Sequence, residues 1–197
     1  MPIGPGGLDS NGIWQFGEDD SEALASDLLN LGMGSVSDAL SVLQVVSTTK
    51  TDTFTASVAQ GAQVAITGLS ATITPSAISS KILVMAAVGL GNVVTANAAQ
   101  YFSLFRDSTA VGIADTAGDR IRVTGSGPRA PTNNDITSVG SNFEDDPATT
   151  SPVVYSLKVS HSVNGTETVY VNRSSNDAND NYRQRTISTI VLMEVAG

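Results

Sequence analysis

The chain offers few side chains for acid, base or nucleophilic catalysis. It has a single histidine, His161, and no cysteine among its 197 residues. Acid–base and covalent catalysis both need a reactive group held by partner groups. His161 stands just before the turn-forming pair Asn164-Gly165, at the expected end of a strand, so we interpret it as a structural residue of a hairpin. The sequence therefore predicts a protein that is not an enzyme.

Two acidic stretches raise the question of a metal ion. Residues 176–181 (NDANDN) alternate oxygen-bearing side chains as a calcium loop does, but Tyr182 stands where such a loop requires glycine and Ser188 where it requires glutamate. We interpret this stretch as a polar loop tip, and whether it binds an ion stays open. Residues 144–147 (EDDP) are interpreted as a turn before a strand. We predict no metal site and no cofactor.

Arginines are the second group with binding chemistry. They suit a sugar, lipopolysaccharide or an acidic partner, although scattered surface arginines are ordinary in a folded domain. A glycan-binding module is an alternative, with residues 172–185 as its loop and Tyr182 as the stacking aromatic. The arginines considered are Arg120, Arg122, Arg129, Arg173, Arg183 and Arg185.

Large apolar side chains stand out in the first 17 residues, which are otherwise rich in glycine and proline. This segment cannot form a core alone, and aromatic anchors dominate the energetics of protein interfaces. We therefore expect it to insert into a protein partner, with the acids that follow as part of the contact. The predicted docking residues are Ile13, Trp14, Phe16, Glu18, Asp19 and Asp20.

The charge distribution bears on the choice of partner. The net charge is −9, and no basic residue precedes Lys50. Nucleic acids and anionic membranes are bound mainly through lysine and arginine, so we expect neither partner. No window approaches the roughly 18 apolar residues of a membrane span, and residues 1–12 lack the pattern of a secretory signal. We expect assembly in a cytoplasm and no membrane insertion.

Residues 20–43 have a helical pattern. Acids crowd the first turn, Gly32 suits a helix end, and residues 35–38 (SVSD) fit a capping box. We predict one or two short helices whose apolar stripes contact other copies of the chain. The stripes comprise Leu24, Leu28, Leu31, Val36, Leu40 and Leu43.

From about Lys50 the apolar period changes to two, which predicts strands. Eight to ten short strands with turn-rich links indicate a mainly β protein, an antiparallel β-sandwich with a jelly-roll-like topology. Residues 153–159 and 168–171 flank Asn164-Gly165 and are expected to form a two-residue hairpin. The predicted organisation is an extended arm with short helices over residues 1–49 and a β-sandwich over residues 50–197.

The last expected strand, residues 186–195, is apolar on both faces, which is unusual where a chain ends. One face carries Val191 and Met193, and the other carries Ile190 and Leu192. Burial against another copy would explain this pattern. We predict that Ile190 and Leu192 are contacts between copies in an oligomer.

Residues 12–40 (GIWQFGEDDSEALASDLLNLGMGSVSDAL) resemble the amino-terminal attachment segment of tail-fibre and related structural proteins of phages that infect marine bacteria and cyanobacteria. Further runs are similar to the β-rich fibre domains of these proteins. The resemblance implies a homotrimer at the virion surface and supplies no catalytic residues. These runs are ITPSAISSKILVMAAV, ADTAGDRIR, FEDDPATTSPVVYSLKV, TVYVNRSS and RTISTIVLMEVA.

The function expected from residues and resemblance together is structural. The chain would be a short trimeric tail-fibre-type protein of a bacteriophage, located in the virion and docked on tail or capsid proteins by its amino-terminal segment. The β-domain would project outward and contact a host surface glycan. A capsid fibre or decoration protein and a glycan-binding module are the alternatives.

Overall fold

The computed structural model describes residues 7–8, 14–15, 42–93, 95, 98–127, 129 and 134–197. The chain divides into two compact units, Met1–Ser41 and Val42–Gly197. In the first unit, strand β1 (Gly7–Leu8) pairs antiparallel with β2 (Trp14–Gln15), and Leu8 lies opposite Trp14. The division falls between Ser41 and Val42, whereas the sequence suggested the change at Lys50.

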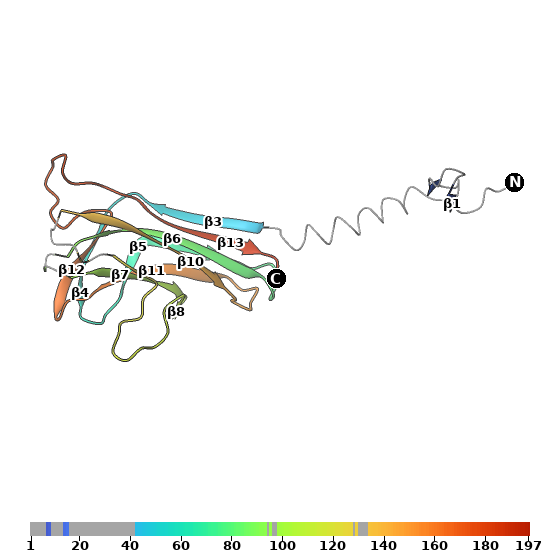
Figure 1. Ribbon diagram of the computed structural model, residues 1–197, viewed down its shortest axis with the longest axis horizontal. Coiled ribbons are helices and arrows are strands. Elements are labelled where there is room, and N and C mark those ends of the chain that lie inside the picture. The colour runs from blue at the N-terminus through green and yellow to red at the C-terminus, as the bar shows by residue number, and fades with distance from the viewer. Residues whose placement is uncertain are drawn as a thin grey trace. The chain divides into compact units, whose positions relative to one another are not determined.

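The second unit is built of antiparallel strands, and the part of the chain that the structure describes contains no helix. This confirms the predicted mainly β, antiparallel class; the jelly-roll-like sandwich stays a prediction. The strands (Figure 1) are β3 (Val42–Lys50), β4 (Phe54–Ala59), β5 (Val64–Ile73), β6 (Lys81–Gly91), β7 (Gln100–Arg106), β8 (Thr109–Val111), β9 (Gly125–Ser126), β10 (Ile136–Asp145), β11 (Val153–His161), β12 (Thr166–Val171) and β13 (Ser188–Val195).

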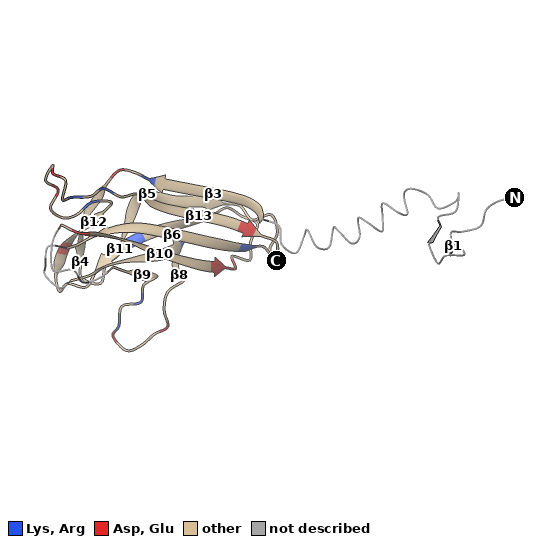
Figure 2. Ribbon diagram, turned by 45° about the horizontal axis from the view of Figure 1, so that its top comes forward, with Lys and Arg blue, Asp and Glu red and all other residues tan. Residues whose placement is uncertain are grey.

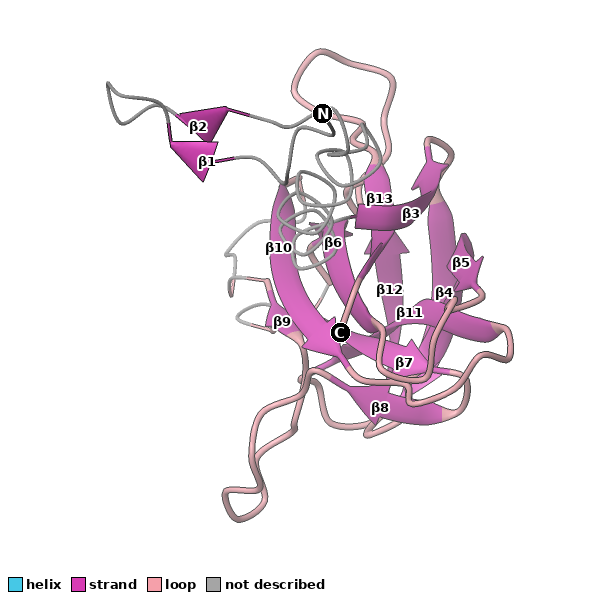
Figure 3. Ribbon diagram, turned by 90° about the vertical axis from the view of Figure 1, so that its right-hand side faces the viewer, coloured by secondary structure: helices cyan, strands magenta, loops and turns pink. Residues whose placement is uncertain are grey.

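The strands form two sheets. The six-stranded sheet has the order β3-β13-β6-β12-β4, with β10 also paired to β6. The five-stranded sheet has the order β5-β11-β7-β8, with β9 also paired to β7. Together the strands curl into a half-barrel (Figure 3). Strand β6 pairs with three neighbours, as expected of a strand with apolar residues on both faces.

The hydrophobic core lies between the two sheets and follows from the period of two. Along β13, alternate residues are fully buried, and the same is true of β6 and β11. Ile190 and Leu192 from one sheet join Tyr155 and Leu157 from the other in a single apolar cluster. Each strand therefore gives one face to this core, and its other face points outward.

The expected hairpin at Asn164-Gly165 is wrong. Strand β11 pairs with β5 and β7 in one sheet, whereas β12 pairs with β4 and β6 in the other. Residues 162–165 therefore cross from one sheet to the other. The backbone N–H of Gln60, beyond β4, donates to the Gly165 carbonyl at 2.7 Å, so the turn closes against β4 and not against β11.

The sequence also suggests a hairpin around residues 116–118, with residues 109–114 and 119–123 as its strands, and this prediction is wrong. Only Thr109–Val111 forms a strand, and residues 113–123 form an exposed loop. This loop projects from the body in Figure 1. The loop ends at Thr124, whose side-chain hydroxyl accepts a hydrogen bond of 2.8 Å from the backbone N–H of Leu104. Strand β7 thus pairs with β11 on one edge and with the short β8 and β9 on the other.

Leu43 corrects the helical prediction at its carboxyl end. It lies in strand β3 and not in a helix. The β-branched run that follows it, Val45-Val46-Ser47-Thr48-Thr49, favours an extended backbone over a helix. The other predicted stripe residues, Leu24, Leu28, Leu31, Val36 and Leu40, lie outside the described residues.

Three glycines within strands are close-packing positions. Gly89 and Gly91 lie within β6, and Gly125 lies in β9. A Cβ atom on Gly91 would stand 2.1 Å from the carbonyl oxygen of Arg173, and one on Gly125 would stand 2.2 Å from the ring of Phe102. Only glycine lets these backbones approach so closely.

Candidate functional site

The predicted docking residues fall mostly outside what the structure describes. Trp14 lies in β2, opposite Leu8 of β1. The remaining docking residues, Ile13, Phe16, Glu18, Asp19 and Asp20, lie outside the described residues. The paired backbone places Trp14 in a short two-stranded ladder, and its role in docking stays a prediction.

Ile190 and Leu192 are not available for contact with another copy. Both side chains are 0% exposed, because the five-stranded sheet of the same chain covers them. The face of β13 that carries Ile190 and Leu192 is the one that the chain itself buries. Both faces of β13 are apolar, and periodicity alone does not say which one the chain itself buries.

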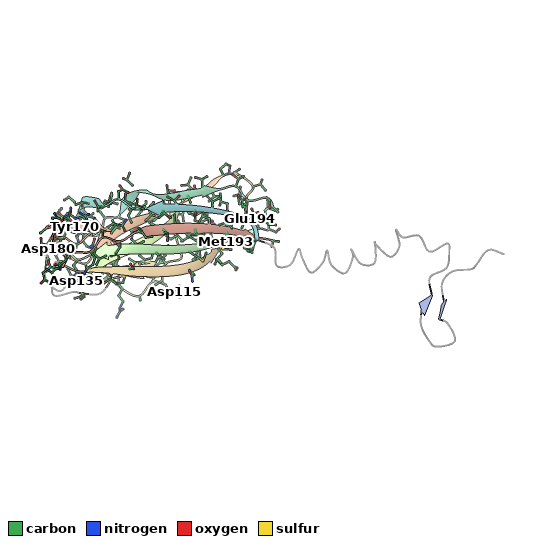
Figure 4. The ribbon with its side chains drawn as sticks, turned by 90° about the horizontal axis from the view of Figure 1, so that it is seen from above. Asp115, Asp135, Tyr170, Asp180, Met193 and Glu194 are labelled. Atoms are coloured by element: carbon green, nitrogen blue, oxygen red, sulfur yellow. The ribbon has the colours of Figure 1, made fainter. Side chains whose placement is uncertain are left out.

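The opposite face of the same strands carries a second apolar surface, which we call the outer patch. Met193 of β13 lies directly between Val45 of β3 and Leu83 of β6. Figure 4 looks onto this sheet and labels Met193 on β13. Val45 is 56% exposed, and the other members are half-buried. The outer patch comprises Val45, Leu83, Met85, Val191, Met193 and Val195.

Glu194 forms a buried carboxylate site behind the outer patch. Its side chain is fully buried and accepts hydrogen bonds from the backbone N–H and hydroxyl of Ser76, both at 2.6 Å, and from Nε2 of Gln44 at 2.5 Å. Burial opposes ionisation of Glu194, but these hydrogen bonds outweigh it and lower the pKa to about 2. The carboxylate therefore joins β3, β13 and the link between β5 and β6.

A second buried carboxylate lies where β10 ends. Asp145 accepts the hydroxyl of Tyr155 at 2.6 Å and the guanidinium of Arg106 at 3.0 Å. Burial, and then the hydrogen bond to Asp145, raise the pKa of Tyr155 far above its usual range. Tyr155 thus stays a neutral donor, and this group links the two sheets at one end of the core.

His161 lies at the end of β11, and the hairpin to which the sequence assigned it does not form. Its side chain is 2% exposed. Nδ1 accepts the backbone N–H of Val163 at 3.1 Å, so Nε2 carries the proton that it donates to the Val58 carbonyl at 2.8 Å. Both ring nitrogens are therefore bound to backbone groups, which is the environment of a structural histidine.

Asn172 is hydrogen-bonded to several segments at the end of the six-stranded sheet that lies away from Glu194. It is fully buried with a left-handed φ of 60°, which asparagine tolerates better than most residues. Its Nδ2 donates to the carbonyls of Lys50 and Asp52, both at 3.0 Å, and its Oδ1 accepts the hydroxyl of Ser188 at 2.6 Å. The residue heads an Asn-Arg-Ser sequon, but its burial in the folded chain leaves no room for a glycan.

The acidic loop that the sequence suggested for calcium is held by arginines. Asp177 pairs with Arg185 at 2.7 Å and with Arg173 at 3.3 Å, and Asp180 pairs with Arg183. Across the residues that the structure describes, no group of three or more His, Cys, Asp or Glu is placed to hold a metal ion. Tyr182, at 74% exposure, is the prominent aromatic of this loop.

Five of the six arginines lie in two different loops, and the sixth, Arg129, lies between β9 and β10. Arg120 and Arg122 lie in the loop of residues 113–123, where they donate to the carbonyls of Ala117 and Ala114. Arg173, Arg183 and Arg185 lie after β12, in a different loop (Figure 1).

Sequence reasoning missed Glu194, the outer patch and Asn172, and the sequence pattern that could have revealed each one differs. Glu194 continues the alternation of Ile190 and Leu192, so the period of two places it on the same face as these two residues. Val45 and Leu83 belong to the outer patch only through strand order, which no local pattern contains. Asn172 carries no sequence signal beyond its residue type.

No protein-family model matches the chain, and no curated protein matches it. Among solved structures, a chain of infectious bursal disease virus, Gt strain, aligns at 17% identity with a TM-score of 0.38 and covers 99% of this chain. The VP2 subviral particle of the same virus aligns at 18% identity with a TM-score of 0.38 and covers 78% of this chain. This chain spans 43% and 38% of those two chains.

The described residues hold no helix of the length and hydropathy that crossing a membrane requires.

Proposed function

We propose that this protein is a structural component of a virus particle, and more narrowly a short trimeric tail-fibre-type protein of a bacteriophage. Its amino-terminal segment would dock on tail or capsid proteins, and the β-domain would project outward as a sandwich. The observation that carries the proposal is the resemblance of residues 12–40 to phage attachment segments, followed by a β-domain with its own core.

The chemistry of the β-domain supports a structural role. Three of its buried polar residues, Glu194, Asp145 and His161, are bound to other parts of the same chain. Glu194 and Asp145 join strands, and the ring nitrogens of His161 are occupied by backbone groups. These groups stabilise an assembly unit and, among the described residues, form no nucleophile and base pair. We therefore propose that the protein is not an enzyme and acts without a cofactor.

The position on the particle defines two variants of the proposal. A tail-fibre protein docks on the tail, whereas a capsid fibre or decoration protein docks on the shell. Both use the same arm and the same projecting domain, and both place the protein in the virion after assembly in the host bacterial cytoplasm. Neither variant requires nucleic acid or membrane insertion, in keeping with the net charge of −9.

A second candidate function is recognition of a host glycan. The exposed ring of Tyr182 favours it, because aromatic faces are common sugar platforms and Arg183 and Asp180 flank the ring in sequence. Binding to a glycan array that is lost in Tyr182→Ala would support this function. Equal binding by Tyr182→Ala and the unaltered protein would remove Tyr182 from the proposal.

The docking proposal is tested by incorporation into particles. The double variant Trp14→Ala, Phe16→Ala is expected to be absent from purified particles while the β-domain keeps its circular dichroism spectrum and melting temperature. Tyr182→Ala is a matched control that removes an exposed aromatic from the β-domain and should be incorporated normally. Normal incorporation of the double variant would overturn docking by these aromatics.

A further inference from the structure

We propose that the outer patch is the surface through which copies of this chain associate, with a second copy as its occupant. The inference rests on the proposed function, in which the protein is a homo-oligomer. It moves the contact between copies from the predicted Ile190 and Leu192 to the opposite face of the same strand.

The strand register makes the outer patch continuous. Val45, Met193 and Leu83 lie side by side across β3, β13 and β6. One step along, Val191 lies opposite Met85. The apolar side chains therefore form one row of three across β3, β13 and β6, and an adjoining row of two across β13 and β6.

The outer patch is turned away from the core of its own chain. The five-stranded sheet packs on the other face, where Ile190, Leu192 and Val84 are at most 1% exposed. No described segment of the chain covers Val45, which lies on the edge strand β3 and is 56% exposed. Contiguous exposed apolar patches commonly mark interaction sites in soluble proteins.

Charge is confined to the rim of the outer patch. Lys81 lies beside Val195 and pairs with Asp146, and Glu144 lies beside Leu83 on β10. Figure 2 shows β3, β13 and β6 without charged residues over most of their length, although the chain carries a net charge of −9. An apolar centre with a charged rim suits a permanent contact with another apolar surface, and every copy carries such a surface.

The outer face of β3, β13, β6 and β10, of which the outer patch is the apolar part, approaches the size that a stable contact between copies needs. Four strands about 4.8 Å apart and about nine residues long, at about 3.3 Å each, give a flat area on the order of 600 Å². Protruding side chains add to that area, and stable interfaces bury about 800 Å² on each partner. Around a symmetry axis, each copy would turn the same patch toward its neighbours.

The test is the solution mass of the full chain, measured by sedimentation equilibrium over a range of concentrations. Val45→Lys and Met193→Lys place a charge in the outer patch, and Thr72→Lys places the same charge on an exposed position of β5. We expect an oligomer for the unaltered protein and for Thr72→Lys, and an association at least about tenfold weaker for the patch variants. Circular dichroism shows whether each variant folds. Val45 is exposed, so Val45→Lys should fold and can test the inference even if the half-buried Met193→Lys does not fold.

Two results would overturn the inference. One is an unaltered protein that is monomeric at every concentration, and the other is a folded Val45→Lys that associates as the unaltered protein does. The first result would also contradict the trimer in the proposed function, whereas the second would contradict this inference alone. The presence of the protein in virus particles is measured separately, on the particles themselves. Failure of this inference is therefore distinguishable from failure of the proposed function.

Discussion

Glu194 of β13 and Gln44 of β3 lie directly opposite each other, and Gln44 Nε2 donates a hydrogen bond of 2.5 Å to the Glu194 carboxylate. Their chain neighbours Met193 and Val45 also lie opposite each other, but on the outer face of the sheet. The same pair of strands thus stabilises the chain on one face and presents an apolar surface on the other.

Replacing Glu194 by glutamine should lower stability in a manner that depends on pH. The pKa of Glu194 is about 2 in the folded chain against 4.5 for the free side chain. A lowered pKa contributes stability above the unfolded value, and that stability is lost as pH falls from about 5 toward 2. Urea unfolding at pH 7 should show a loss of about 2–3 kcal/mol for Glu194→Gln, and the gap should narrow in acid.

The control for this prediction is Glu144→Gln, which changes an exposed carboxylate on the neighbouring strand β10. It should unfold as the unaltered protein does at both pH values. A gap between Glu194→Gln and the unaltered protein that stays constant from pH 7 to pH 3 would contradict the account of Glu194.

The link between Asp145 and Tyr155 should appear as a coupling energy. Tyr155→Phe removes one hydrogen bond and should cost about 1–2 kcal/mol, whereas Asp145→Ala also leaves Arg106 without its buried partner and should cost about 3 kcal/mol or more. The double variant should cost less than the sum of the single variants, measured by chemical denaturation. Strict additivity would show that the two side chains do not interact, and Tyr182→Phe serves as an exposed control.

Asn172 combines hydrogen bonds with a left-handed backbone, and two substitutions separate these contributions. Asn172→Gly loses the side-chain bonds but keeps the conformation, whereas Asn172→Ala loses the bonds and adds strain of about 1 kcal/mol. We expect the highest melting temperature for the unaltered protein, a lower one for Asn172→Gly and the lowest for Asn172→Ala. Equal melting temperatures for the two variants would argue against backbone strain at this position.

The close approach at Gly91 predicts a steric effect. Gly91→Ala brings a Cβ within 2.1 Å of the Arg173 carbonyl oxygen and should cost about 3 kcal/mol. Gly140→Ala on β10 is the matched control, because its nearest atom would be at 3.5 Å, an ordinary contact. Thermal unfolding of both variants makes the comparison, and equal stability of the two would show that β6 and Arg173 separate readily.

Much of the strand content follows from local sequence. The alternation in residues 153–159 and in residues 186–195 reflects burial of one face, and both segments are strands in the structure. Sheet membership does not follow, because it depends on partners distant in sequence. Asn164-Gly165 is the typical hairpin pair, yet β11 and β12 belong to different sheets, so the pairing of Gln60 with Gly165 decides the path of the chain.

The same limit applies to the candidate surface. The sequence shows that residues 186–195 are apolar on both faces, and it therefore suggests a second covered surface. The side that faces the core is fixed by where the five-stranded sheet packs, and only strand order brings Val45 and Leu83 to either side of Met193. The outer patch is thus a property of the topology, whereas Ile190 and Leu192 were chosen from periodicity alone.

The central claim is that this protein is part of a virus particle, and the most direct measurement is its copy number in particles purified by density gradient, by quantitative mass spectrometry. We predict a fixed number of copies per particle, in multiples of the oligomer, that resists washing in high salt. Antibodies against residues 42–197 should then label intact particles. Abundant protein in infected cells with none in the purified particles would contradict the claim.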